Sequence, residues 1–379
     1  MRFNGNDWQR GWAGAIFCLA LAGVSHAGQV SADPQGFLSV GAAALSDTYF
    51  TLPYHRSPAF EGLVQSVNGN VLTLQVPTGG LGWTAGEWVQ QAGVQADSFY
   101  VLVGSGQQEG AGYPITASTT STLTVNPGSV NLASTIAAGE TIRIIPYWTL
   151  ASLFPAQTGV VATASISGAD AGTLIMGFTP TAGINLAASQ INYYYNGTAF
   201  GGPGWRCQGL AFTTLCDNLP ILPGSVLIFR NTTTSAANWT VNGAVQMAQF
   251  RHSVGTLSPG VQQDNLIGPQ VGVAVTAAGS GLIASGVVNP TSSISGANAD
   301  LVLTYSGPTT GYNPAMDYIY YYYNGTVFGG PGWRRQGAAF TQIFDPTALI
   351  QPGIPVMVRK VGTATPESTD WLLLPNYLQ

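Results

Sequence analysis

Residues 193–209 read Tyr-Tyr-Tyr-Asn-Gly-Thr-Ala-Phe-Gly-Gly-Pro-Gly-Trp-Arg-Cys-Gln-Gly, and nearly the same stretch returns 128 positions later at residues 321–337. Fifteen of the seventeen positions are identical, which chance does not produce. The same spacing aligns Ser-Ile-Ser-Gly-Ala at 165–169 with an identical segment at 293–297. Periods of about 20–50 residues are typical of solenoids, whereas this longer period indicates tandem domains. We therefore expect two homologous domains in the second half of the chain.

Each copy of this stretch is expected to begin as a strand and then turn, because a Tyr run is followed by Asn-Gly-Thr and Gly-Gly-Pro-Gly. Successive side chains of a strand point to opposite faces, so Tyr193 and Tyr195 share one face and Tyr194 takes the other. Either a face of this kind packs in a core, or it forms an exposed aromatic platform for sugar rings or a partner chain; tyrosine suits both roles. The candidate ligand-binding residues are Tyr193, Tyr195, Trp205, Tyr321, Tyr323 and Trp333.

The Gly-Gly-Pro-Gly-Trp-Arg segments at 201–206 and 329–334 allow two explanations. Glycines permit positive φ and proline fixes its own φ, so together they specify a tight turn, with the indole in the core. Alternatively, a rigid loop presents Trp205 and Trp333 to a ligand, as loops held by stiff scaffolds often do. We favour the first explanation, because a glycine-rich turn needs no ligand to account for it.

Of the three cysteines, Cys18 lies near the N-terminus, and Cys207 and Cys216 lie nine positions apart in the first copy. Their counterparts in the second copy are Arg335 and Phe344, so the pair is present or absent together. In an oxidising compartment this favours a disulfide that closes a short loop. A metal site is not predicted, because no histidine lies near them in the sequence.

The composition of the chain indicates an all-β fold. The chain is 45% hydrophobic but only 7% charged, with 49 Gly and 23 Pro, which is typical of packed structure with many turns. Residues 62–74 contain the clearest hairpin, because Asn68-Gly69 accepts the positive φ angles of a type I′ turn. We expect an N-terminal β-barrel or sandwich-like domain followed by two homologous β-sandwich-like domains.

The N-terminus resembles a secretory signal peptide of 27 residues. Arg2 and Arg10 supply positive charge, an apolar run follows, and Ser25-His26-Ala27 gives a small-residue cleavage site. The apolar run is shorter than the roughly 20 residues that a membrane helix needs, so no span is expected after signal removal. We expect export to the periplasm, the cell surface or the medium. The expected divisions are a signal peptide at 1–27, an N-terminal β domain at 28–150 and repeat modules at 151–258 and 259–379.

No catalytic motif is found in the sequence. Metal-binding, nucleophile-elbow and phosphate-loop patterns are missing, and His55 is more typical of a surface or packing residue than of a general base. Asp217 and Asp345 recur at equivalent positions, but turn capping explains them equally well. The formal net charge of −5, without a basic cluster, argues against nucleic acid as a partner. No cofactor and no metal are predicted.

Several motifs resemble those of an uncharacterised family of exported, multi-copy bacterial proteins. They are Asp-Thr-Tyr-Phe-Thr-Leu-Pro-Tyr-His-Arg at 47–56, the hairpin at 62–74, Val-Gly-Ser-Gly at 103–106 with Glu-Gly at 109–110, and Ile-Ile-Pro-Tyr-Trp-Thr-Leu at 144–150 with Leu-Phe-Pro at 153–155. The resemblance implies export and a shared β architecture. It assigns no catalytic or binding residues.

These observations favour a non-enzymatic structural or adhesive protein that acts at the cell surface or outside the cell, with other copies of itself as partners. A glycan-binding protein that uses the Tyr- and Trp-rich faces is the alternative. An extracellular hydrolase with an unlocated carboxylate pair is a more remote one.

Overall fold

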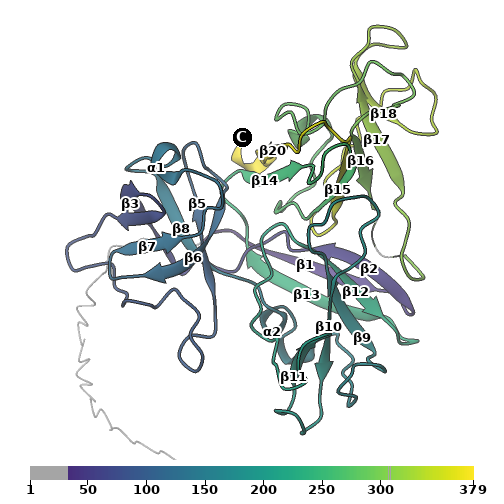
Figure 1. Ribbon diagram of the computed structural model, residues 1–379. Helices are drawn as coiled ribbons and strands as arrows, with labels where there is room; N and C mark the ends of the chain where they lie inside the picture. Colours follow the sequence, from purple (N-terminus) through teal and green to yellow (C-terminus); the bar gives the residue numbers. More distant parts are fainter. Residues whose placement is uncertain (1–32, 306, 308) are drawn as a thin grey trace, which may run out of the picture.

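The computed structural model describes residues 33–379 except residues 306 and 308. The predicted signal peptide at 1–27 lies outside the described residues. Within the described part the protein is nearly all β, as the composition predicts, with strands β1 to β20 (Figure 1). The α-helices there are two single turns, α1 (Leu132–Thr135) and α2 (Leu150–Leu153). Three 3-10 turns occupy Pro155–Gln157, Ala278–Ser280 and Asn376–Leu378.

A closed six-stranded barrel occupies residues 60–146 and lies on the left of Figure 1. Its strand order is β3-β4-β7-β6-β5-β8. The predicted hairpin at Asn68-Gly69 joins β3 to β4, with Gly69 at φ +57°. Val64 and Leu72 have no exposed surface and pack in the barrel interior. The strands are β3 (Phe60–Asn68), β4 (Val71–Leu74), β5 (Phe99–Val103), β6 (Gly112–Ser118), β7 (Thr122–Val125) and β8 (Thr141–Pro146).

The first repeat unit, residues 35–51 and 148–244, takes strands from both sides of the barrel in the sequence. Five strands form a sheet in the order β11-β10-β9-β12-β2, and β1 pairs with β13 in a separate ribbon. Phe50, Phe229 and Trp239 belong to the core between sheet and ribbon. The strands are β1 (Gln35–Ala42), β2 (Ser46–Thr51), β9 (Thr173–Gly177), β10 (Gln190–Tyr195), β11 (Gly204–Cys207), β12 (Val226–Asn231) and β13 (Ala237–Ala244).

The second repeat unit, residues 250–373, has the same arrangement strand for strand. Its sheet has the order β18-β17-β16-β19-β15, and β14 pairs with β20. Phe250 and Trp371 from the ribbon pack in one core with Val302 and Val358 from the sheet. The strands are β14 (Phe250–Gly255), β15 (Gln263–Ile267), β16 (Leu301–Thr304), β17 (Tyr318–Tyr323), β18 (Gly332–Arg335), β19 (Val356–Lys360) and β20 (Ser368–Leu373).

This strand pairing differs from the expected domain boundaries. Residues 35–51 were expected within the N-terminal β domain, but β1 and β2 are hydrogen-bonded to β13 and β12 of the first repeat unit. The expected boundary at 258 also separates β14 from its partner β20. The barrel is therefore an insertion into the first repeat unit, between β2 and β9. The second unit has no barrel at the equivalent place, where a loop with a 3-10 turn connects β15 to β16.

The two repeat units hold each other through a reciprocal contact. Asp47 on β2 accepts two hydrogen bonds from Arg230 of its own unit, at 2.7 and 2.8 Å, and one at 2.8 Å from the backbone N–H of Asn313 in the second unit. Asp264 on β15 accepts bonds from Arg359 at 2.6 and 2.9 Å. A 2.7 Å bond from the backbone N–H of Asn185, in the first unit, completes the set. We call these two sets the reciprocal clamp.

Backbone hydrogen bonds also join the two units in a reciprocal way. The N–H of Asp47 donates to the carbonyl of Gly311 at 3.0 Å, and the N–H of Asp264 donates to that of Gly183 at 2.9 Å. Each unit therefore lays one loop of its own along the edge strand of the other. The units are consequently related by an approximate two-fold axis, as in a symmetric dimer joined into one chain.

Within the described residues no helix is both long and apolar enough to cross a membrane.

The clamp predicts unequal effects of two arginine substitutions. Arg359→Gln removes the cation from the fully buried Asp264 carboxylate and should lower the free energy of unfolding by about 3 kcal/mol. The control is Arg56→Gln, which breaks the more exposed Arg56–Asp97 pair and should cost about 1 kcal/mol or less. Chemical denaturation of both variants measures the difference. Equal effects would contradict a buried clamp.

Candidate functional site

The six predicted ligand-binding aromatic residues are buried, with between 1 and 4% of each side chain exposed. They do not form an exposed platform, and this corrects the platform hypothesis. The indoles of Trp205 and Trp333 pack in the cores of their units, as the turn explanation expects. The tyrosine face is covered as well. The residues concerned are Tyr193, Tyr195, Trp205, Tyr321, Tyr323 and Trp333.

The repeated Ser-Ile-Ser-Gly-Ala segments supply that cover over the tyrosines. The Tyr193 hydroxyl donates to the carbonyl of Ile166, and the Tyr321 hydroxyl donates to that of Ile294. Gly168 has φ +69°, and a Cβ there would meet the Tyr193 ring at 2.6 Å, so glycine is required at this position. Both faces of the sheet are therefore occupied by the unit itself.

Next to each indole lies a buried arginine that fixes two loops. Arg206 is 1% exposed and donates to the carbonyls of Phe212 at 2.9 Å, Phe200 at 3.2 Å and Gly202 at 2.7 Å. Its guanidinium also lies 5.4 Å from the centre of the Tyr195 ring, a cation–π distance. A buried charge is costly unless it is hydrogen-bonded, so this arginine requires both loops to keep their shape.

Arg334 repeats the arrangement in the second unit. It donates to the carbonyls of Phe340 at 3.0 Å, Phe328 at 3.2 Å and Gly330 at 2.6 Å, and lies 5.4 Å from the Tyr323 ring. The same three loop carbonyls are thus held in both units.

The loops that these arginines hold present apolar side chains to solvent. Phe200 and Phe212 are 49% and 48% exposed, and their ring centres lie 6.2 Å apart. Phe200 and its counterpart Phe328 have φ of +52° and +54°, a conformation that bulky residues rarely adopt. We call these groups the first tip (Phe200, Leu210, Phe212 and Leu215) and the second tip (Val327, Phe328, Phe340 and Ile343). Our sequence reasoning considered only Tyr and Trp and missed them, although Phe200 and Phe328 belong to the near-identical stretch.

The predicted disulfide is present beside the first tip. Cys207 and Cys216 are bonded, with their Cα atoms 6.0 Å apart. In the second unit the guanidinium of Arg335 lies 4.6 Å from the centre of the Phe344 ring. A cation–π contact therefore joins the two segments that the disulfide joins in the first unit.

Asp217 and Asp345 bind backbone groups within their own units. Asp217 accepts a 3.3 Å bond from the N–H of Trp205, and Asp345 accepts a 3.2 Å bond from that of Ala278. The two bonds join segments that lie 12 and 67 positions apart in the sequence, so these contacts are not those of the local turn cap that the sequence suggested. Across the described residues, no group of three or more His, Cys, Asp or Glu side chains is placed to hold a metal.

A second candidate site lies where the barrel meets both repeat units. A cleft of about 270 Å³ has Tyr100 and Tyr147 of the barrel on one wall and Leu222 and Pro223 of the first unit on another. The second unit closes it with His252 and other residues. Its size is just below the roughly 300–1,000 Å³ typical of ligand pockets, which often form between domains.

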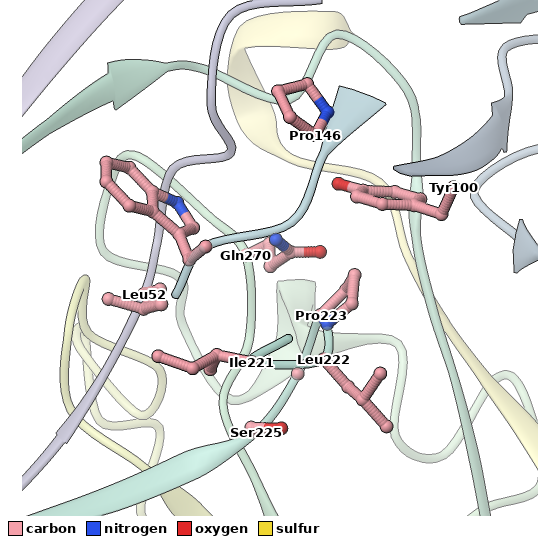
Figure 2. Close-up of a pocket in the computed structure, with 10 residues that line it drawn as sticks. Leu52, Tyr100, Pro146, Ile221, Leu222, Pro223, Ser225 and Gln270 are labelled. Carbon is pink, nitrogen blue, oxygen red and sulfur yellow. The ribbon is translucent and has the colours of Figure 1, made fainter. Parts of the chain in front are cut away.

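The cleft continues into a narrow recess of about 10 Å³, enough for one water molecule (Figure 2). Tyr100 extends its hydroxyl toward Pro146 and the Gln270 amide, and Leu222 and Pro223 lie below them in this view. Tyr100, Leu222, Pro223 and Gln270 line both the recess and the wider cleft, so the two spaces form one site.

Contacts of the barrel with the second unit fix this cleft. The carbonyl of Glu109, in the loop between β5 and β6, accepts 3.0 Å bonds from the side chains of Gln249 and Arg251. Arg251 also donates to the carbonyl of Gln107 at 2.7 Å and forms an ion pair with Asp370. The cleft is therefore held in a defined shape.

Comparison with known proteins finds no matching family model, no similar curated protein and no similar solved structure. The tips and the cleft are therefore the features of the molecule that bear on its function.

Two histidines, His55 and His252, predict how the free energy of unfolding depends on pH. Burial lowers the pKa of His55, beside the linker into the barrel, and of His252, in the cleft, to about 4 each. The unfolded chain, with an ordinary pKa near 6.5, therefore binds protons that the folded chain does not. The free energy of unfolding that depends on these two neutral histidines should be fully present above about pH 6.5 and should decrease as the pH falls toward 4.

Urea denaturation at a series of pH values between neutral and 4 measures this decrease. The double variant His55→Asn/His252→Asn is the control and should show a flatter dependence over the same range. An unchanged urea midpoint across this range in the native chain would contradict the prediction.

Proposed function

We propose that the protein is an exported, non-enzymatic adhesive or structural protein that associates through its two apolar tips, with other copies of itself as partners. The observation that carries this proposal is the duplication of an exposed apolar group on a buried arginine support. The predicted signal peptide and the disulfide support the exported location.

The tips do not serve the stability of the fold. Half-exposed Phe200 and Phe328 in a left-handed backbone conformation each cost free energy, of the order of 1–3 kcal/mol. Among the described residues Arg206 and Arg334 have no carboxylate partner, and their hydrogen bonds to loop carbonyls offset the cost of burying each charge. Backbone outliers of this kind cluster at binding sites, where the surrounding structure holds them in place.

Two tips on one rigid pair of units also favour association with repeated or extended partners. Binding through both tips converts the second contact into an intramolecular one, so overall affinity can exceed that of one tip by a factor of about 10² to 10⁴. A protein that adheres or assembles gains from such bivalency, whereas a single-site enzyme does not.

The variants Phe200→Asn and Phe328→Asn test the proposal. Asparagine tolerates positive φ better than phenylalanine, so each variant should be at least as stable as the native chain. Self-association, followed by light scattering against concentration, should weaken at least tenfold with one variant and disappear with both.

Phe37→Ser is the matched control, because this phenylalanine is 75% exposed but lies on β1, outside the tips. It should leave association unchanged. Association of the double tip variant at the native level, or equal loss in the Phe37→Ser control, would overturn the proposal.

A further inference from the structure

The cleft between the barrel and the repeat units is lined in part by polar side chains. Tyr100, Tyr147 and Gln270 are 4, 5 and 7% exposed, so more than nine-tenths of each is buried. Among the described residues their polar atoms are not among the enclosed ones that lack a partner, so they remain open to the cleft, and the half-buried His252 lines it as well. These polar groups line the cleft, so whatever occupies the cleft, water or a ligand, supplies their hydrogen-bond partners.

The groups are neutral. Burial lowers the pKa of His252 to about 4 and raises those of the Tyr100 and Tyr147 hydroxyls, so all three are uncharged near neutral pH. The one ionic side chain in the lining, Arg251, is already paired with Asp370. The cleft therefore offers no free charge to attract an ionic ligand.

Apart from Ser253, the remaining lining is glycine or apolar. Leu222 is 55% exposed, and Pro223 lies next to it in the same wall. A ligand that fits must combine several hydroxyl groups with apolar C–H faces. A sugar ring has this combination, and each hydroxyl both donates to and accepts from tyrosine, amide and imidazole groups.

We propose that the cleft binds one ring of a neutral saccharide, with Tyr100, Tyr147, Gln270 and His252 hydrogen-bonded to its hydroxyls and Leu222 and Pro223 against its C–H face. This site is separate from the tips and does not depend on the function proposed for them. It also differs from the buried aromatic residues that the sequence offered for glycan binding.

Saturation-transfer NMR and calorimetry on the full chain test the proposal. The probes are cellobiose, maltose, lactose and N,N′-diacetylchitobiose, with glucuronic acid and glucosamine as charged comparators. At least one neutral disaccharide should bind, and more tightly than either charged sugar.

Two variants remove polar atoms from the cleft and nearly preserve its volume. Tyr147→Phe and Gln270→Leu should each weaken binding about tenfold or more, because each removes a hydrogen bond in a buried site. Both should leave stability equal or higher, since the deleted groups are open to the cleft. A merely structural role for these side chains predicts the opposite change in stability.

Tyr318→Phe is the control, because Tyr318 is 46% exposed and lies outside the cleft. It should bind saccharides as the native chain does, and so should the double tip variant Phe200→Asn/Phe328→Asn. If no neutral probe bound the native chain, the cleft would be only a water-filled gap between domains, and the proposal would be overturned. Binding unchanged in Tyr147→Phe and Gln270→Leu, or preference for a charged sugar, would overturn it too.

Discussion

Two buried carboxylates, Asp47 and Asp264, determine how the rest of the structure is assembled. Each lies on the edge strand of a five-stranded sheet, and each accepts a bond from a loop N–H of the other repeat unit in addition to those from the arginine of its own unit. An open edge strand is prone to pairing with another chain, and here each edge is partly covered by the other unit. The clamp thereby fixes the orientation of the units, which in turn holds both tips and the cleft in defined positions.

The chain has few charged residues, and several of them are buried where loops and repeat units meet. Lys360, the single lysine, is 2% exposed and donates to Asp300 at 2.5 Å and to the carbonyl of Val287 at 2.8 Å. Arg206 and Arg334 are equally buried and hold the loops of the tips. Interactions of this kind specify geometry more than they add stability, because burying a charge removes it from water. The surface is left to Thr, Ser, Asn, Gln and exposed apolar groups, which suits a protein that associates through its tips.

The sequence predicted the fold class, the hairpin at Asn68-Gly69 and the disulfide, because each depends on local or strongly repeated patterns. It did not assign β1 and β2 to the first repeat unit. The two units share little more than Ser-Val-Gly, at 39–41 and 253–255, in their first strands, and the inserted barrel separates β1 and β2 from the other strands of their unit. Alternation predicted that Tyr193 and Tyr194 lie on opposite faces but not that both faces are covered. The cleft could not be predicted at all, because its residues come from three parts of the chain that only the fold brings together.

Hydrogen exchange of the backbone amides in the loops at residues 183–185 and 311–313 tests the reciprocal clamp most directly. Loops of this length ordinarily exchange rapidly, but here the N–H groups of Asn185 and Asn313 donate to buried carboxylates of the opposite unit. The account predicts strong protection in both loops in the native chain, and loss of protection at Asn185 in Arg359→Gln. Exchange of both loops at the rate of an unstructured peptide in the native chain would contradict it.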